Sequence, residues 1–321
     1  MIVAEHLTKT YGAHRAVDDL SFSVGPGRVT GFLGPNGAGK TTTMRMILGL
    51  DHPTSGRVTI DGRPYRDLPV PLREVGALLD AKAIQGNRSA LAHLEVLAAS
   101  NGIPRSRALE ALRLVGLEQV ARRRVGGFSL GMSQRLGVAA ALLGDPHTLL
   151  FDEPVNGLDP EGIQWIRELM KGLASEGRTV LVSSHLMSEM ALTADHLIVI
   201  GRGRLIADSS VEEVIEAGSR QSVLVRSRDD SALAARLEAL GAGVVPAPAG
   251  GLLVSGTGPG AVGEAALAAA IVLEELTPQR VSLEEAFMEL TRGEVEFAAG
   301  GLAGTAPSAL PEAASPLEPR Q

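Results

Sequence analysis

Apolar residues gather in short runs over the first two thirds of the chain, and stretches with helical spacing separate these runs. The runs that are typical of buried strands are residues 29–33, 148–151, 179–183 and 196–200. Strands that alternate with helices predict an α/β fold with a mainly parallel sheet covered on both faces. Over residues 89–143, leucines recur at helical spacing without a strand pattern, which predicts a helical insert.

The pattern changes from about residue 221. The helical stretches are 232–240 and 265–270, and the strand-like runs are 222–226, 244–245, 252–254 and 271–276. Ser282, with Glu285 three residues later, is a capping box that predicts the start of a last helix. The order β-α-β-β-α-β-α predicts a small C-terminal α+β ferredoxin-like domain over residues 221–297. Residues 298–321 are mostly Ala, Gly and Pro, which predicts a disordered tail.

Composition narrows the possible chemistry. The 321 residues carry a net charge of −7 and include no cysteine, which excludes disulfides, Cys-ligated zinc and thiol catalysis. The longest apolar run of the Ala-rich C-terminal half, 265–273, has nine residues, whereas a membrane-spanning helix needs about 20. We therefore expect no membrane span, and the polar residues at positions 5, 6 and 9 argue against a signal peptide. The acidic balance disfavours nucleic acid as a partner.

A glycine-rich loop follows the first of these strands. Residues 34–41 match G-x-x-x-x-G-K-[ST], and a helix-like run, 42–48, comes next. Glycines let successive backbone N–H groups turn toward phosphate oxygens, and the helix N-terminus adds positive partial charge. In this motif Lys40 reaches the β- and γ-phosphates, and the Thr41 hydroxyl binds Mg²⁺. The predicted nucleotide-binding residues are Gly34, Pro35, Asn36, Gly37, Ala38, Gly39, Lys40, Thr41 and Thr42.

Two acids, Asp152 and Glu153, follow the run 148–151 directly. Taken alone, such a run is more often a strand that enters a solvated turn. Beside a phosphate loop, the first acid holds Mg²⁺ through its water shell. The second acid points the other way along the pleat, where it orients and polarises an attacking water. We therefore predict that Asp152 is a metal ligand and that Glu153 is catalytic.

Together these motifs resemble an ATP-binding cassette (ABC) ATPase, the nucleotide-binding subunit of an ABC transporter, over about residues 1–215. The resemblance implies a P-loop domain with a mainly parallel sheet core, an antiparallel β subdomain and a helical insert. Residues 128–135 resemble the signature segment of this family. Ser129 and Gly131 match it, whereas Leu130 and Met132 depart from it. In the family this segment contacts the γ-phosphate held by the opposite subunit, which implies that role for Ser129 and Gly131.

Four further positions carry the resemblance. Residues 156–160, with Asp159, resemble the dimer loop that follows the catalytic Glu. His185 resembles the switch histidine that contacts the γ-phosphate, and Tyr11 resembles the aromatic that stacks on adenine. Asp80 stands where the family usually has a Gln that contacts Mg²⁺ and the attacking water. An Asp is a hard oxygen ligand but cannot donate a hydrogen bond when ionised. The resemblance therefore implies a metal-binding position for Asp80 and leaves its catalytic role open.

The resemblance implies catalysis of ATP hydrolysis by Lys40, Glu153 and His185. Two subunits, as a homodimer or a heterodimer with a paralogous ATPase subunit, sandwich two ATP molecules with Mg²⁺. Their cycle drives a separate integral membrane permease from the cytoplasmic side of the cell membrane.

The segments 80–88, 128–135 and 282–287 look like those of the drug and antibiotic exporter branch, of the daunorubicin-resistance and bacitracin-resistance type. This branch implies efflux of a drug, antibiotic or other small amphipathic molecule. The alternative is a regulatory or weakly hydrolysing cassette that is not directly engaged in transport, and Asp80 and Leu130 keep that alternative open.

Overall fold

The computed structural model describes residues 1–321 with the exception of 81–83, 219–221, 249, 280–281 and 292–321. The predicted tail, 298–321, lies outside the described residues. Among the described residues, no helix combines the length and the apolar character that a bilayer span requires.

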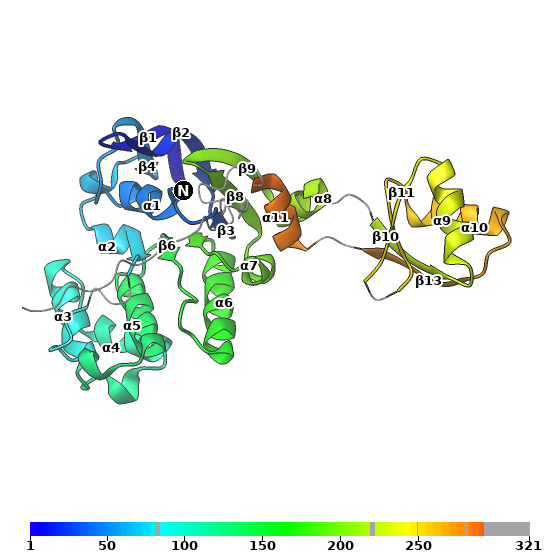
Figure 1. Cartoon of the computed structure of the whole chain (residues 1–321). Helices are drawn as coiled ribbons and strands as arrows, with labels where there is room; N and C mark the ends of the chain where they lie inside the picture. Colours follow the sequence, from blue (N-terminus) through cyan, green and yellow to red (C-terminus); the bar gives the residue numbers. More distant parts are fainter. Residues whose placement is uncertain (81–83, 219–221, 249, 280–281, 292–321) are drawn as a thin grey trace, which may run out of the picture.

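A six-stranded sheet forms the centre of the large domain, in the order β5-β6-β7-β3-β8-β9 (Figure 1). Its strands are β3 (Arg28–Leu33), β5 (Val75–Leu78), β6 (Thr148–Asp152), β7 (Thr179–Ser183), β8 (His196–Gly201) and β9 (Arg204–Ser210). Only β9 pairs in the antiparallel sense. The four strands expected from the apolar runs and the mainly parallel sheet are therefore confirmed.

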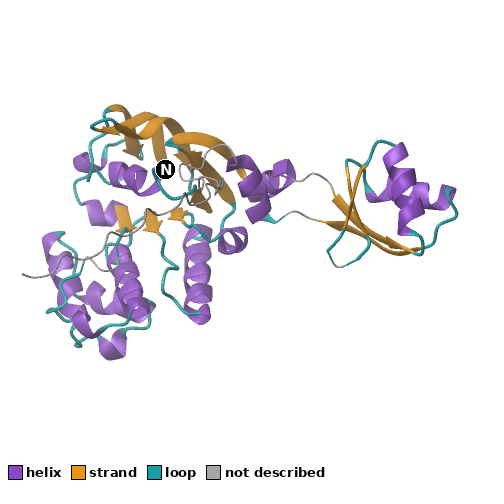
Figure 2. Ribbon diagram, in the orientation of Figure 1, coloured by secondary structure: helices purple, strands orange, loops and turns teal. Residues whose placement is uncertain are grey.

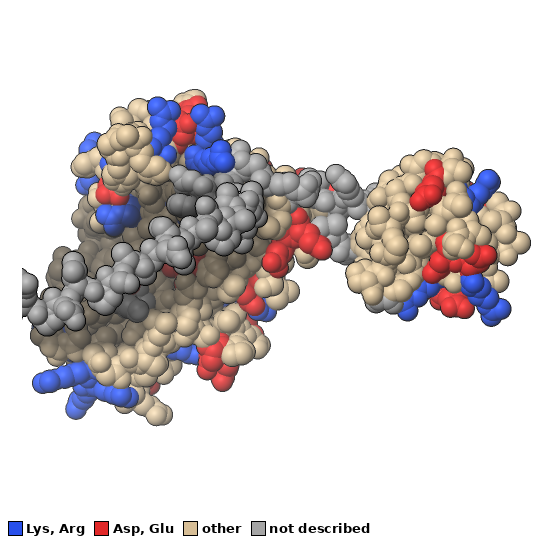
Figure 3. Space-filling view, viewed as in Figure 1, with Lys and Arg blue, Asp and Glu red and all other residues tan. Residues whose placement is uncertain are grey.

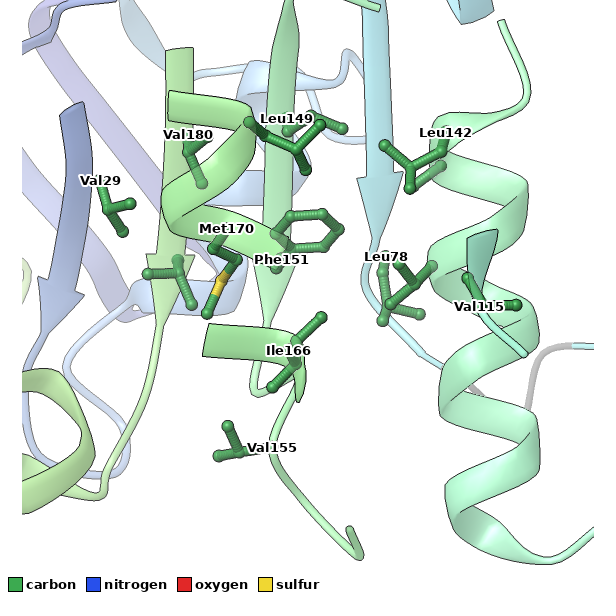
Figure 4. Close-up of a cluster of buried hydrophobic side chains, with 14 of the residues drawn as sticks. Val29, Leu78, Val115, Leu142, Leu149, Phe151, Val155, Ile166, Met170 and Val180 are labelled. Atoms are coloured by element: carbon green, nitrogen blue, oxygen red, sulfur yellow. The ribbon is translucent and has the colours of Figure 1, made fainter. Parts of the chain in front are cut away.

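The sheet is covered on both faces, as its continuous apolar strands require. Along β6, Leu149 and Phe151 face one apolar cluster, and Leu150 faces the other. Figure 4 shows the first cluster, in which Met170 and Ile166 of helix α6 (Pro160–Ser175) pack near Phe151. The second face is covered by helix α1 (Lys40–Ile47) and by an antiparallel sheet. That sheet has the order β2-β1-β4, with β1 (Ile2–Tyr11), β2 (His14–Val24) and β4 (Ser55–Ile60).

The segment 89–143 is helical, and its described residues include no strand element. Its helices are α3 (Ala90–Ser100), α4 (Ser106–Leu114) and α5 (Leu130–Leu142), with single turns at Glu118–Val120 and Val125–Gly127. Helix α5 approaches β5 so closely that a Cβ on Gly137 would lie 2.5 Å from a methyl carbon of Leu78. The predicted insert is thus confirmed, and its last helix is packed directly on the central sheet.

The remaining helices of the large domain are short. They are α2 (Pro71–Glu74), α7 (Met187–Thr193) and α8 (Val211–Gly218), with a single turn at Tyr65–Asp67. Helix α8 follows the edge strand β9, and its buried Val211 and Val214 belong to the same apolar cluster as Phe151. On the face shown in Figure 3, acidic side chains gather near helix α11 (Leu283–Thr291), whose first turn holds Glu284 and Glu285.

A second, smaller unit lies beyond α8 (Figures 1 and 2). It consists of β10 (Ser222–Ser227), α9 (Asp230–Ala239), β11 (Gly243–Pro246), β12 (Leu252–Ser255), α10 (Pro259–Ala268) and β13 (Leu273–Gln279). The strands pair in the order β11-β12-β10-β13, all antiparallel. Buried side chains such as Val225, Leu237 and Val262 form a separate core. The β-α-β-β-α-β order expected for a ferredoxin-like unit is present.

Helix α11 packs on the large domain, although the predicted range 221–297 groups it with the small one. Its Leu283, Ala286 and Phe287 are buried in the same cluster as Val211 and Val214 of α8. The four-stranded unit is therefore an insertion between two helices that both belong to the ATP-binding-cassette-like core. The register agrees with this arrangement, because Ser222 at the start of β10 pairs with Gln279 at the end of β13.

Candidate nucleotide-binding site

The loop between β3 and α1 needs glycine at defined points. Gly37 and Gly39 have φ values of +83° and +100°, which L side chains rarely adopt. A Cβ on Gly39 would lie 2.5 Å from the carbonyl oxygen of Ala16, and one on Gly34 would lie 2.5 Å from that of Ile200. The loop is thus held between the hairpin start of β2 and the end of β8. It leads directly into the N-terminus of α1, where backbone N–H groups lack helical partners.

Lys40, the first residue of α1, folds back over this loop. Its Nζ donates hydrogen bonds to the carbonyl oxygens of Gly34 at 2.7 Å and Pro35 at 3.3 Å. Burial lowers the pKa of Lys40, while the nearby carboxylates of Glu153 and Asp152 act in the opposite direction. The structure therefore places a largely buried cation at the centre of the loop.

Asp152 ends strand β6 beside the loop. The Thr41 hydroxyl donates to Asp152 Oδ2 at 2.8 Å, and the Ser183 hydroxyl donates to Asp152 Oδ1. Ser183 ends the neighbouring strand β7 and pairs directly with Asp152. The carboxyl ends of two adjacent parallel strands thus bring these groups to the first turn of α1. The sequence predicted Thr41 and Asp152 separately as Mg²⁺ ligands beside the loop, and it did not identify Ser183.

Glu153 and His185 meet at the same edge of the sheet. Glu153 Oε2 lies 2.7 Å from Nδ1 of His185. The Glu153 side chain is 24% exposed and that of His185 is 50% exposed. Glu153 has a φ of +49°, and its N–H donates to the Ser183 hydroxyl at 3.0 Å. Two residues that the sequence predicted separately, 32 positions apart, are therefore joined in one hydrogen-bonded pair.

These groups face a cavity of about 600 Å³. Its lining consists of Tyr11, His14, Ala16, Asn36, Gly37, Ala38, Gly39, Lys40, Thr41, Thr42, Asp152, Glu153, Asn156 and His185. The loop, the two acids, the histidine and the tyrosine that the sequence singled out separately thus come together. His14 and Ala16 were missed. The signal for His14 is the hairpin register, which pairs it with Tyr11.

Tyr11 forms the rim of this cavity and is 46% exposed. Its hydroxyl donates to Asp51 Oδ2 at 3.0 Å, and Lys9 Nζ lies 4.9 Å from the ring centroid. Arg45 also donates to Asp51, at 2.7 Å. Burial raises the pKa of Tyr11, and the Asp51 carboxylate adds to this effect. The ring is therefore fixed at its edge while its carbon atoms stay accessible from the cavity.

Ser129, Gly131 and Asp159 do not line this cavity. The Ser129 hydroxyl caps α5 by accepting from the Met132 N–H at 3.2 Å, and Asp159 caps α6 by accepting from the Gly162 N–H at 2.9 Å. Leu130, the first residue of α5, is absent from the positions with positive φ. The replacement of a family glycine by Leu130 is consequently accommodated without backbone strain.

Asp80 lines a second cavity of about 310 Å³ that adjoins the first. Leu130, Asp152 and Glu153 line it as well. Asp80 therefore shares a space with the two acids, as its predicted place in the loop after β5 requires. A residue that sequence reasoning missed, Gln134 of α5, also lines this space.

Comparisons with known proteins agree with this geometry. A family model described as "ABC transporter" matches residues 17–156, and a domain of unknown function matches residues 221–284. The bacitracin transport ATP-binding protein BcrA of Bacillus licheniformis is 44% identical over 211 residues, which are 65% of this chain and 69% of that protein. The lantibiotic transport ATP-binding protein SrtF of Streptococcus pyogenes is 38% identical over 66% of this chain and 92% of that protein.

Solved structures extend the comparison to the fold. The ATP-binding subunit of an ABC transporter is 27% identical, covers 67% of this chain and 92% of its own, and gives a TM-score of 0.62. A cassette solved as a dimer in a post-hydrolysis state with ADP and Pi is 26% identical over 65% of this chain and 98% of its own, with a TM-score of 0.59. The chain therefore belongs to the ATP-binding proteins of ABC transporters, and it is an ATPase of that family.

Proposed function

We propose that this ATPase is the motor subunit of an exporter, which drives efflux of a drug, antibiotic or other small amphipathic molecule through a separate membrane permease. The observation that carries the proposal is the meeting of the phosphate loop, Asp152 and the Glu153–His185 pair around one cavity. The transport names of the bacitracin and lantibiotic relatives support export as the use of that chemistry.

Phosphate binding follows from the loop. Lys40 donates to the carbonyl oxygens of Gly34 and Pro35 in this structure, and it exchanges these partners for β- and γ-phosphate oxygens when ATP enters. The exchange favours the nucleotide because a charge-assisted hydrogen bond to phosphate is stronger than one to a neutral carbonyl. Tyr11 stacks on the adenine ring at the opposite end of the cavity.

The residues beside the loop fit Mg²⁺. Thr41 Oγ1 and Asp152 Oδ2, both hard oxygen ligands, lie 2.8 Å apart. Mg²⁺ is commonly held by one or two protein oxygen ligands together with phosphate oxygens and water. Thr41 and Asp152 would hold Mg²⁺, with Asp80 near them. Mg²⁺ held there would supply positive charge that offsets the charge of the phosphates.

Hydrolysis is assigned to Glu153 and His185. The Glu153 carboxylate orients the attacking water and accepts its proton. His185 donates from Nδ1 to the Glu153 carboxylate, and we assign Nε2, the other ring nitrogen, to contact with a γ-phosphate oxygen. Their 2.7 Å hydrogen bond fixes the direction of the carboxylate.

A second subunit completes each site. Ser129 and Gly131 lie outside the cavity of their own chain, which agrees with a role on the nucleotide of an opposing subunit, and Asp159 begins α6 at the dimer loop. Related cassettes were solved as dimers. We assign the subunits to a homodimer, or to a heterodimer with a paralogous ATPase. The helical insert and the loop around Asp80 attach this dimer to a permease at the cytoplasmic face of the membrane.

The test has two parts. Steady-state ATP hydrolysis of the full chain is compared with that of Glu153→Gln, which keeps the shape of the side chain and removes the base. Co-purification with a membrane protein and ATP-dependent efflux from vesicles then test the export assignment. Equal and negligible hydrolysis by both proteins in the presence of the permease would instead support the regulatory alternative.

A further inference from the structure

Gln134 lies in the second turn of α5 and is 6% exposed. Its Nε2 donates to two carbonyl oxygens outside its own helix, that of Asn156 at 3.2 Å and that of Glu153 at 3.4 Å. Both neighbours are acceptors, so only the orientation that presents Nε2 to them makes hydrogen bonds. The helix that begins at the Ser129 segment thus holds the backbone on both sides of Pro154 and Val155.

Glu153 has a backbone conformation that needs such support. Its φ of +49° lies in the left-handed region, which costs free energy in any residue other than glycine and persists only where neighbouring groups hold it. The N–H of Glu153 is held by the Ser183 hydroxyl of β7 at 3.0 Å. The carbonyl is held by Gln134 and by the N–H of Asn156 at 3.2 Å. Gln134 is therefore the link between this backbone and α5.

The other half of the Gln134 amide points to a positional role. Gln134 Oε1 is buried and has no hydrogen-bond partner among the described residues. A buried acceptor without a partner destabilises the fold. An apolar residue of the same shape would avoid this cost but would leave the carbonyl oxygens of Glu153 and Asn156 without the Gln134 donor. The amide thus directs both of its donated hydrogen bonds to the backbone around Glu153.

Two further contacts fasten α5 to the same stretch of chain. The guanidinium of Arg135 lies 4.3 Å from the ring centroid of Trp165 in α6. The Leu130 side chain occupies the space that a Cβ on Gly157 would need, with a methyl carbon 2.0 Å from that position. Helix α5 and the segment from Glu153 to Trp165 are thus joined at three successive points. Movement of α5 must displace the carbonyl of Glu153 or break these contacts.

We propose that Gln134 is a positioning residue that couples the Ser129 helix to the carboxylate of Glu153 within one subunit. When α5 is docked, Gln134 holds the strained backbone that aims Glu153 at the γ-phosphate. When the helical insert turns away, that support is withdrawn and hydrolysis slows. This inference rests on the proposed role of Glu153 in activating water.

The test compares Gln134→Met, which keeps the shape of the side chain and removes the donor, with the wild-type chain. A misplaced catalytic group lowers the rate by about 10- to 100-fold. We expect a loss of that size in kcat for Gln134→Met, with the KM for ATP within about twofold. Gln134→Asn keeps the donor on a shorter stem and gives an intermediate kcat. Gln164→Met is the matched control, because Gln164 is an exposed glutamine of α6 whose side chain donates to Glu168 on the same helix. We expect its kcat to stay at the wild-type value.

The single tryptophan gives a second readout. Trp165 emission reports the contact with Arg135, so unchanged emission in Gln134→Met shows that α5 stays docked. A wild-type kcat in Gln134→Met overturns the inference, as does a loss of ATP binding equal to the loss of kcat. Glu153→Gln in the same assay separates the two ideas. If Glu153→Gln hydrolyses ATP as fast as wild type, the proposed role of Glu153 fails; if it is slow and Gln134→Met is not, only the coupling by Gln134 fails.

Discussion

Gly39 has two independent reasons to be glycine, and substitutions can separate them. Its φ is +100°, and a Cβ there would lie 2.5 Å from the carbonyl oxygen of Ala16. Gly177, in the turn before β7, has a φ of +89° with nothing within 4 Å of the same position. Gly172, inside α6, has neither a positive φ nor a close neighbour. The three glycines therefore form a graded series for replacement by alanine.

The expected effects follow from these geometries. Gly177→Ala places an alanine in the left-handed conformation without any close contact. The unfolding free energy therefore falls by about 1–2 kcal/mol. Gly39→Ala adds a contact that must displace the backbone of β2, which costs a further 1–3 kcal/mol by order of magnitude. Gly172→Ala gains about 0.5–1 kcal/mol because alanine has less backbone entropy to lose in a helix. In a domain of this size each kcal/mol shifts the melting temperature by roughly 2–4 °C.

Urea and thermal unfolding with and without ATP measure both the strain and its functional consequence. ATP at about 100 times its dissociation constant stabilises a binding-competent chain by about 2.7 kcal/mol. Gly177→Ala keeps this increment, whereas Gly39→Ala loses most of it because the N–H groups of the loop are displaced. A Gly39→Ala variant that is no less stable than Gly177→Ala, and that ATP stabilises to the same extent, would show that the contact with Ala16 does not constrain the loop.

Three further predictions concern single side chains. Tyr11→Ala weakens ATP binding by roughly two- to tenfold, in line with a stacking contribution of about 0.5–1.5 kcal/mol. Tyr11→Phe stays near wild type in a fluorescent-nucleotide titration, and equal losses for the two variants would contradict stacking. Burial lowers the pKa of Lys40 from 10.5, so just below pH 10.5 the unfolded chain binds more protons than the folded chain. The stability of wild type relative to Lys40→Met therefore rises with pH in that window. Urea unfolding midpoints of wild type and Lys40→Met, measured from pH 7 to 10.5, test this prediction. A stability difference that falls with rising pH contradicts it. Phe287→Ala lowers the unfolding free energy of the large domain by about 3–5 kcal/mol, whereas Met288→Ala, at a position that is 62% exposed, changes it little; equal effects in calorimetry would show that α11 does not pack there.

Much of the large domain was predictable because its signals are local. Strands β6 and β7 are buried at every residue, and such strands appear in a sequence as unbroken apolar runs. The signal of the phosphate loop is equally local, because the whole G-x-x-x-x-G-K-[ST] pattern lies in one continuous segment, residues 34–41. The meeting of Asp152 with Thr41 follows from the order of a parallel sheet, which brings the carboxyl ends of its strands to one edge.

Other features depend on distant partners that no local pattern contains. The capping box of Ser282 predicted where α11 begins but not that its apolar face packs against α8, some 70 residues earlier in the chain. In the sequence, Gln134 is an ordinary polar residue of a helical stretch. The carbonyl oxygens that accept from it lie 19 and 22 residues further along the chain. The left-handed φ of Glu153 is equally hidden, because glutamate has no intrinsic preference for that region.

The central claim is that Glu153 activates water for ATP hydrolysis at the cavity formed by the phosphate loop. Steady-state phosphate release by the full chain and by Glu153→Gln, with Mg²⁺ and saturating ATP, tests it most directly. The account predicts a kcat at least about 100-fold lower for Glu153→Gln, as for loss of a general base, with ATP affinity preserved. Equal rates for the two proteins would contradict it.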